Sequence, residues 1–125
     1  MESVIAKVTE LLSEVVPESH FLTNPRLGVT YPYLVFSYDS EGQELGQDGA
    51  YIDIDVFDNQ GENQERIERV ASQLRWHLEN KAVMLTDCYL RFRFEGANPI
   101  DTQSDSLQRR HVRFYITIDW RRDYD

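Results

Sequence analysis

Residues 51–58 read YIDIDVFD, and this alternation decides the fold class. Successive side chains of a β-strand point to opposite faces of the sheet, so the stretch predicts a strand with one apolar side and one polar side. The two sets are Ile52, Ile54 and Val56 on one side and Tyr51, Asp53, Asp55 and Phe57 on the other. The apolar side must be covered, so further strands and a covering layer are expected elsewhere in the chain.

Three other segments are rich in aromatic and β-branched residues and are predicted as strands, at about Tyr33–Tyr38, Cys88–Glu95 and Gln108–Arg121. The segment Cys88–Glu95 places Cys88, Leu90, Phe92 and Phe94 on one side. The segment Gln108–Arg121 places Val112, Phe114, Ile116, Ile118 and Trp120 on one side. Residues 39–50, DSEGQELGQDGA, predict a long mobile loop that closes a hairpin between the first two strands. Residues 96–106 predict a second polar loop between the last two strands.

Two segments carry apolar residues at helical spacing. Residues 3–16 form an amphipathic stripe that Pro17 ends, and residues 60–79 form a second one. Asn59 followed by Glu62 is typical of a capping box at the start of the second helix. The pairs Glu62–Arg66 and Glu65–Arg69 have the i,i+4 order that supports a helix.

The order helix, strand, strand, helix, strand, strand predicts an α+β fold: an antiparallel sheet of about four strands with both helices on one face. The 125 residues suit one domain, 1–125. The opposite face of the sheet is then open and polar. The charged residues predicted there are Asp53, Asp55, Arg91, Arg93, Arg113, Asp119 and Arg121.

Two interpretations of this open face remain. Tyrosines interleave with the charges, and Tyr and Arg are enriched where proteins touch, so the face is a candidate interface between copies of the chain. Alternatively the charges pair across strands within one molecule.

Charge is distributed unevenly along the chain. The net charge is −9, and between Leu27 and Glu65 there is no Lys or Arg among nine acids. From Arg66 onward the chain contains 11 Lys or Arg and 9 Asp or Glu. An acidic middle repels phosphates and argues against wrapping nucleic acid, while unlike halves suit self-association. General acidity of a soluble protein is the simpler explanation.

Other classes of protein lack the sequence features they need. No apolar run approaches the roughly 20 residues that span a bilayer, and no secretory signal is evident, so folding in a cytoplasm is expected. The single cysteine, Cys88, has core parity and cannot form an internal disulfide. The three histidines, His20, His77 and His111, have no metal-ligand spacing, and no cofactor is predicted.

Asp53 and Asp55 are the remaining candidates for chemistry. A metal-dependent enzyme could use this pair, but it would need a third oxygen ligand, such as Asp119 or Glu95, and nearby arginines would neutralise the carboxylates. Strand-face residues are the more economical reading. A small cytoplasmic adaptor is a further alternative.

Three stretches, TYPYLVF at 30–36, YIDIDVFDNQGENQERIERVASQL at 51–74 and RRHVRFYITIDW at 109–120, carry a resemblance that covers nearly the whole chain. In this order they resemble the tail terminator or tail-completion proteins, which join head to tail in long-tailed bacteriophages. The resemblance implies a small α+β subunit that forms a ring, typically a hexamer, at the head-proximal end of the tail tube.

The resemblance also implies a function without catalysis or cofactor. Such a ring caps the tail tube and joins it to the head-completion or connector protein, in the neck of a virion assembled in a bacterial cytoplasm. DNA passes through without specific binding. The predicted loop would then contact a neighbouring ring or line the channel through its acids, Asp39, Glu41, Glu44 and Asp48.

Overall fold

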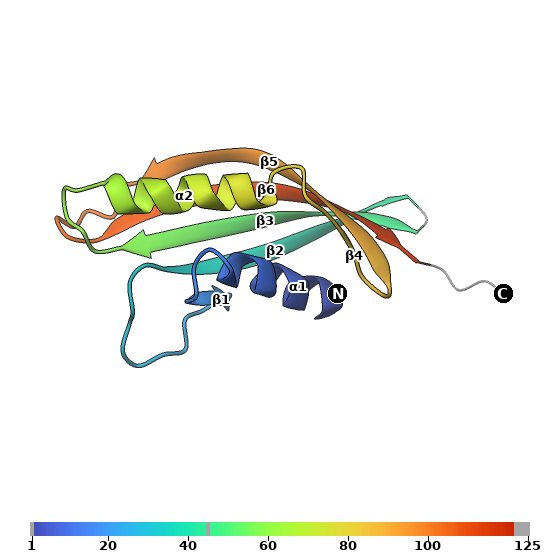
Figure 1. The fold of residues 1–125 in the computed structure, drawn as a ribbon, viewed down its shortest axis with the longest axis horizontal. Helices are drawn as coiled ribbons and strands as arrows, with labels where there is room; N and C mark the ends of the chain where they lie inside the picture. The colour runs from blue at the N-terminus through green and yellow to red at the C-terminus, as the bar shows by residue number, and fades with distance from the viewer. Residues whose placement is uncertain (1, 45, 122–125) are drawn as a thin grey trace.

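A computed structural model describes residues 2–44 and 46–121, with the side chains of residues 43 and 44 left outside the description. The elements are α1 (Glu2–Ser13), β1 (Ser19–Phe21), β2 (Tyr33–Glu44), β3 (Gln47–Asp58), α2 (Glu65–Leu78), β4 (Ala82–Met84), β5 (Cys88–Ile100) and β6 (Gln108–Trp120). The strands form one six-stranded sheet in the order β1-β2-β3-β6-β5-β4 (Figure 1). Every neighbouring pair is antiparallel except β1 beside β2.

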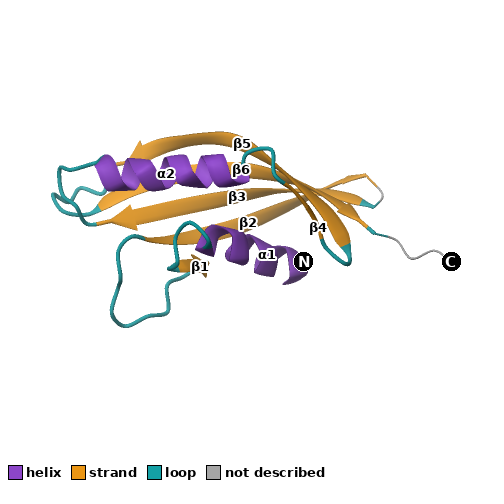
Figure 2. Ribbon diagram, in the orientation of Figure 1, coloured by secondary structure: helices purple, strands orange, loops and turns teal. Residues whose placement is uncertain are grey.

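The predicted α+β class, with both helices on one face of the sheet, is confirmed. α1 packs near β1, and α2 lies across β3, β6 and β5 (Figure 2). Ile52, Ile54 and Val56 are fully buried against the helices, and the predicted parity of β5 and β6 also holds. The buried core side chains contributed by β5 and β6 are Cys88, Leu90, Phe92, Val112, Phe114, Ile116 and Ile118.

The long mobile loop predicted over 39–50 is wrong. β2 continues to Glu44 and β3 begins at Gln47, so almost the whole segment is a paired β-ribbon (Figure 1). β6 pairs with the start of β3, as Ala50 faces Ile116 and Gln47 faces Asp119. Pairing with β6 therefore helps to hold this acidic, glycine-containing segment in extended form. The register between β2 and β3 shifts between Gly42 and Glu44.

The second polar loop is also shorter than predicted. β5 continues to Ile100, paired with β6 as far as Arg109, after a bulge between Phe94 and Gly96. Gly96 has φ +144°, a backbone conformation that favours glycine. The sequence also missed β1 and β4, which are three residues each and too short to show a period of two.

Both helices are shorter than predicted. α1 ends at Ser13, and the chain then turns as the Val16 N–H donates to the Leu12 carbonyl at 2.8 Å. α2 begins at Glu65 and not at 60, so the capping box of Asn59 and Glu62 does not form. Glu62 precedes the helix, and the Glu62–Arg66 pair is therefore not an i,i+4 pair within it.

Asp58 explains the later start of α2. Its carboxylate is fully buried and accepts two hydrogen bonds from the Arg66 guanidinium, including one from Nε at 2.7 Å. It also accepts one from the N–H of Asn59 at 2.8 Å. Gln108 at the start of β6 donates to the carbonyls of Gly61 and Asn63 at 2.8 and 2.7 Å. These contacts fix the 59–64 connection to the sheet as a non-helical segment.

Candidate functional site

The open face of the sheet carries a chain of ion pairs along β3 and β6. Asp53 lies opposite Arg113, and Asp55 lies opposite His111. The Asp53 carboxylate is 3.2 Å from Arg113 Nε and 3.0 Å from His111 Nε2. Asp55 is 3.0 Å from Arg109 and 3.4 Å from His111 Nδ1. Each aspartate therefore has two cationic or polar partners from the neighbouring strand.

Aromatic rings extend this chain at both ends. Arg113 lies 3.9 Å over the ring of Tyr51, which contacts Tyr115 edge to face at 4.9 Å. Arg93 of β5 lies 4.9 Å over the Tyr115 ring. At the other end Phe57 stacks on Tyr33 at 5.0 Å. We call this set the ladder; its members are Tyr33, Tyr51, Asp53, Asp55, Phe57, Arg93, Arg109, His111, Arg113 and Tyr115.

The ladder includes only part of the predicted site. Arg91 and Asp119 pair with each other at 3.3 Å at one side of it, and Asp119 also accepts from the Gln47 amide at 2.6 Å. Arg93 contacts Glu95 at 2.8 Å. Arg121 is exposed at the end of the described chain. Pairing across strands within one molecule, the second sequence-based reading, is thus present, although Arg91, Arg93 and Arg113 remain exposed.

His111 is the residue that sequence reasoning missed. It lies between Asp53 and Asp55, two positions before Arg113 on the same side of β6. Strand parity could have placed it on the open face, but its position opposite Asp55 depends on the register between β3 and β6. The register depends on how two strands pair, so the sequence of either strand alone does not determine it.

The contacts of Asp53 and Asp55 do not suit the binding of a catalytic metal ion. Both carboxylates face arginines, which neutralise the charge a divalent ion would need. Among the side chains that the structure describes, which leave out that of Glu44, no group of three or more from His, Cys, Asp or Glu is placed to hold a metal ion. Asp119, a suggested third ligand, pairs with Arg91 instead.

The acids of the β2–β3 ribbon have different surroundings. Asp39 and Glu41 are exposed, and Glu41 accepts a hydrogen bond from the Tyr115 hydroxyl at 3.0 Å. Asp48 instead accepts from Trp120 Nε1 at 2.7 Å. Burial, with the charges of Asp48 and Cys88, raises the pKa of Tyr38 to about 12. The side chain of Glu44 lies outside the described residues.

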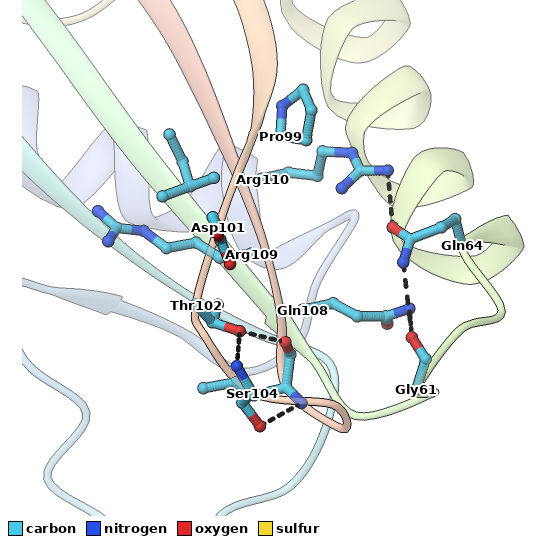
Figure 3. Close-up of a pocket in the computed structure, with 11 residues that line it drawn as sticks. Gly61, Gln64, Pro99, Asp101, Thr102, Ser104, Gln108, Arg109 and Arg110 are labelled. Carbon is cyan, nitrogen blue, oxygen red and sulfur yellow. Dashed lines mark hydrogen bonds between the residues drawn. The ribbon is translucent and has the colours of Figure 1, made fainter.

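A pocket of about 570 Å³ lies where β5 and β6 meet the start of α2 (Figure 3). The start of α2 is at the opposite end of the sheet from the β2–β3 ribbon (Figure 1). Its polar side chains are held by the fold. The Thr102 hydroxyl donates to the Leu107 carbonyl at 2.6 Å, and the Arg110 guanidinium contacts Gln64 and Glu68 at 2.9 and 3.2 Å. These contacts shape the turn and present no nucleophile paired with a base.

Cys88 and the helices add no further chemistry. Cys88 is buried in the core, as predicted, and burial, with the charge of Asp87, raises the pKa of its thiol to about 11. A thiol of this kind is a poor nucleophile at neutral pH. None of the described helices is long and apolar enough to cross a membrane.

Comparison with known proteins identifies the fold. No protein-family model matches the sequence, and no curated protein matches it. Among solved structures, the chain is similar to a chain of the virion of a native gene transfer agent particle, with a TM-score of 0.66, 15% identity, and coverage of 86% of this chain and 84% of that one. A second solved chain, covered over 99% of its length and 98% of this one, gives a TM-score of 0.74 at 11% identity. At these identities the likeness establishes a shared fold.

Proposed function

We propose that this protein is a non-catalytic structural component of a phage-like virion, and that within the virion it forms the ring that terminates the tail tube and joins it to the head connector. The observation that carries the proposal is the fold shared over 86% of the chain with a virion chain of a gene transfer agent particle. The sequence resemblance to tail terminator and tail-completion proteins adds the particular place in the virion.

The arrangement of charge supports assembly into a ring. In a cyclic ring one patch of a subunit meets a different patch of the next, so the subunit needs two unlike surfaces. The β2–β3 ribbon exposes Asp39 and Glu41, while Arg91 and Arg93 are exposed on β5, at the other side of the sheet. These acids and arginines lie on different strands of the same open face, with Tyr115 contacting both Glu41 and Arg93. Unlike charges at different parts of this face offer two patches that a neighbouring copy can complement.

The proposal assigns two roles to these surfaces. Asp53, Asp55, Arg91, Arg93, Arg113, Asp119 and Arg121 contribute to contacts between subunits, in addition to the pairs they make within one chain. The ribbon acids face a neighbouring ring or the channel, where negative charge keeps passing DNA from binding. The partners are further copies of the chain, the tail tube protein and the head connector.

Light scattering after size-exclusion chromatography, followed by electron microscopy with the cognate tail tube protein, tests the proposal. The expected result is a closed ring of defined mass that stops tube growth when it is added to polymerising tube protein. The comparison sample is tube protein without the chain, whose tubes should continue to lengthen. A chain that stays monomeric at high concentration and leaves tube length unchanged would favour the adaptor reading and contradict the ring.

A further inference from the structure

Trp76 of α2 is the one exposed aromatic side chain among the described residues. It is 79% exposed, whereas the other described Phe, Tyr and Trp side chains are buried or half-buried. The buried residues of α2 are Ile67, Val70, Ala71, Leu74 and Leu78. Trp76 is not part of this core set, and an aromatic surface of this size is typical of a binding contact.

A pocket of about 550 Å³ lies beside Trp76. Its described lining residues are Glu14, Val15, Gln73, Trp76 and His77. The first two follow α1 and the other three belong to α2, so we call this pocket the helix groove. Both helices cover the same face of the sheet (Figure 2). The helix groove is therefore on the opposite side of the sheet from the ladder, and it can be occupied while the open face touches other molecules.

The lining of the helix groove suits a cation. Glu14 is the one acid of the lining, and none of the described lining residues is Lys or Arg. The Glu14 carboxylate lies 2.9 Å from His77 Nε2, and the Glu14 side chain is 51% exposed. A carboxylate accepts several hydrogen bonds, so Glu14 has room for a second partner. Because His77 follows Trp76 in the chain, this contact holds the carboxylate at the residue next to the indole.

Arginines lie over several aromatic rings of this chain, but Trp76 has no such partner. Arg113 lies 3.9 Å over the ring of Tyr51, and Arg75 lies 4.4 Å over the ring of Phe94. No cation of the described residues lies over the ring of Trp76. The indole is the aromatic face that attracts a cation most strongly. The helix groove thus joins an open indole face to a carboxylate that can pair with a cation.

We propose that the helix groove binds an arginine side chain from a basic segment of another protein. The guanidinium lies over the ring of Trp76 and donates to the carboxylate of Glu14. Arginine suits both contacts better than lysine, because its planar guanidinium stacks on aromatic faces and makes paired hydrogen bonds to a carboxylate.

The net charge of the chain favours a basic partner over a second copy. At −9 the chain attracts a basic segment over long range, whereas a second copy would bring a further −9 to the groove. The inference goes beyond the ring proposed above and does not depend on it. In a ring that uses the open face for its subunit contacts, the helix groove would let each subunit hold a protein of a different kind.

NMR titration with a tri-arginine peptide, blocked at both ends, tests the proposal. The chain has two tryptophans, so the indole N–H signals of Trp76 and Trp120 can be followed separately. The Trp76 signal should move as peptide is added. The Trp120 signal should stay in place, because Trp120 Nε1 donates to Asp48 at 2.7 Å. A Trp76 signal that does not move overturns the proposal.

Peptides of other composition test the choice of arginine. A tri-lysine peptide should bind more weakly than tri-arginine, and a tri-glutamine peptide should leave both indole signals unchanged. Equal affinity for tri-lysine and tri-arginine would overturn the assignment of a stacked guanidinium. Binding of tri-glutamine would show that the groove does not select for charge.

Substitutions separate binding in the groove from general attraction to an acidic chain. Trp76→Ala and Glu14→Gln should each weaken the binding of tri-arginine about tenfold, measured by isothermal titration calorimetry. Both side chains are at least half exposed, so the variants should fold. Glu62→Gln is the matched control, since it removes one exposed acid just before the start of α2, and it should leave the affinity nearly unchanged. An equal loss in Glu14→Gln and Glu62→Gln would refute the site.

The concentration of the chain alone supplies the last test. A Trp76 signal that moves as the chain is concentrated without peptide would make a second copy the occupant, and would overturn the proposal of a basic segment from another protein. Light scattering on Trp76→Ala keeps this result apart from the ring. A ring that uses the open face should persist in this variant, so the failure of either proposal leaves the other standing.

Discussion

The two faces of the sheet are built from the same strands but stabilised by different physics. On β3, Ile52, Ile54 and Val56 are buried among helix side chains, while Asp53 and Asp55, one position away, pair with cations of β6 at the surface. Apolar burial is cooperative and hard to replace, whereas an exposed ion pair contributes about 0–1 kcal/mol. The core face therefore determines the fold. Residues of the open face can be substituted to suit contacts with other molecules at little cost in stability.

The largest effect is expected from matched truncations on the two faces. Ile54→Ala removes a fully buried side chain and should lower the free energy of unfolding by about 2–5 kcal/mol. Ile100→Ala removes the same atoms from a half-buried position opposite Arg109 and should cost less than half as much. Urea unfolding monitored by circular dichroism measures both. Equal losses would break the distinction between the faces.

Asp58 is a polar group on the buried side, and its substitution should rank second. Asp58→Asn keeps the volume but removes the charge that faces Arg66, and should cost about 1–3 kcal/mol of unfolding free energy. Asp105→Asn, at an exposed acid of the 101–107 turn, is the control and should have little effect. A loss at Asp58 no greater than at Asp105 would show that the buried pair adds no stability.

The same residue predicts a pH dependence. Burial acts to raise the pKa of Asp58, but the hydrogen bonds from Arg66 and Asn59 and the charge of Arg66 outweigh it, so the pKa is lowered. Its contribution to stability is complete above the unfolded pKa of about 3.9 and is lost as the pH falls through the lower folded value. The stability gap between the unaltered chain and Asp58→Asn should thus close below about pH 4. A gap that stays constant to acid pH would contradict this assignment.

The contrast between faces also explains what the sequence could predict. Period-two alternation predicted β3, β5 and β6 and the side that each residue faces. Burial of one face of a strand produces this alternation of apolar and polar residues in the local sequence. Residues 39–50 were mispredicted because their glycines and acids favour a loop, while the pairing of β2 with β3 and of β3 with β6 holds them extended. The start of α2 was mispredicted because Arg66 reaches back to Asp58 instead of pairing along the helix.

The candidate site was less predictable than the fold. The parity of the strands placed Asp53, Asp55, Arg91, Arg93 and Arg113 on the open face, but which cation meets which acid depends on register. His111 between the two aspartates and the Arg113 contact with Tyr51 became visible only in three dimensions.

Neutralising the two ladder acids should have a smaller effect on folding. Asp53→Asn with Asp55→Asn is expected to change the unfolding free energy by about 1 kcal/mol or less and to weaken self-association. Addition of Mg²⁺ or Ca²⁺ should leave the melting temperature of either chain unchanged. A metal-linked rise in the melting temperature of the unaltered chain, lost in the double variant, would instead support the enzyme reading.

Reversing the charges of Arg91 and Arg93 should affect folding least and association more. Arg91→Glu with Arg93→Glu removes the exposed pairs to Asp119 and Glu95, so the unfolding free energy should change by about 1 kcal/mol or less. Self-association, measured by sedimentation, should weaken clearly because these arginines face the proposed neighbour. Arg69→Glu with Arg75→Glu, which reverses two arginines on the helix side of the sheet, keeps the same change in net charge. If both double variants lose association equally, net repulsion alone accounts for the effect and the open face has no special role in assembly.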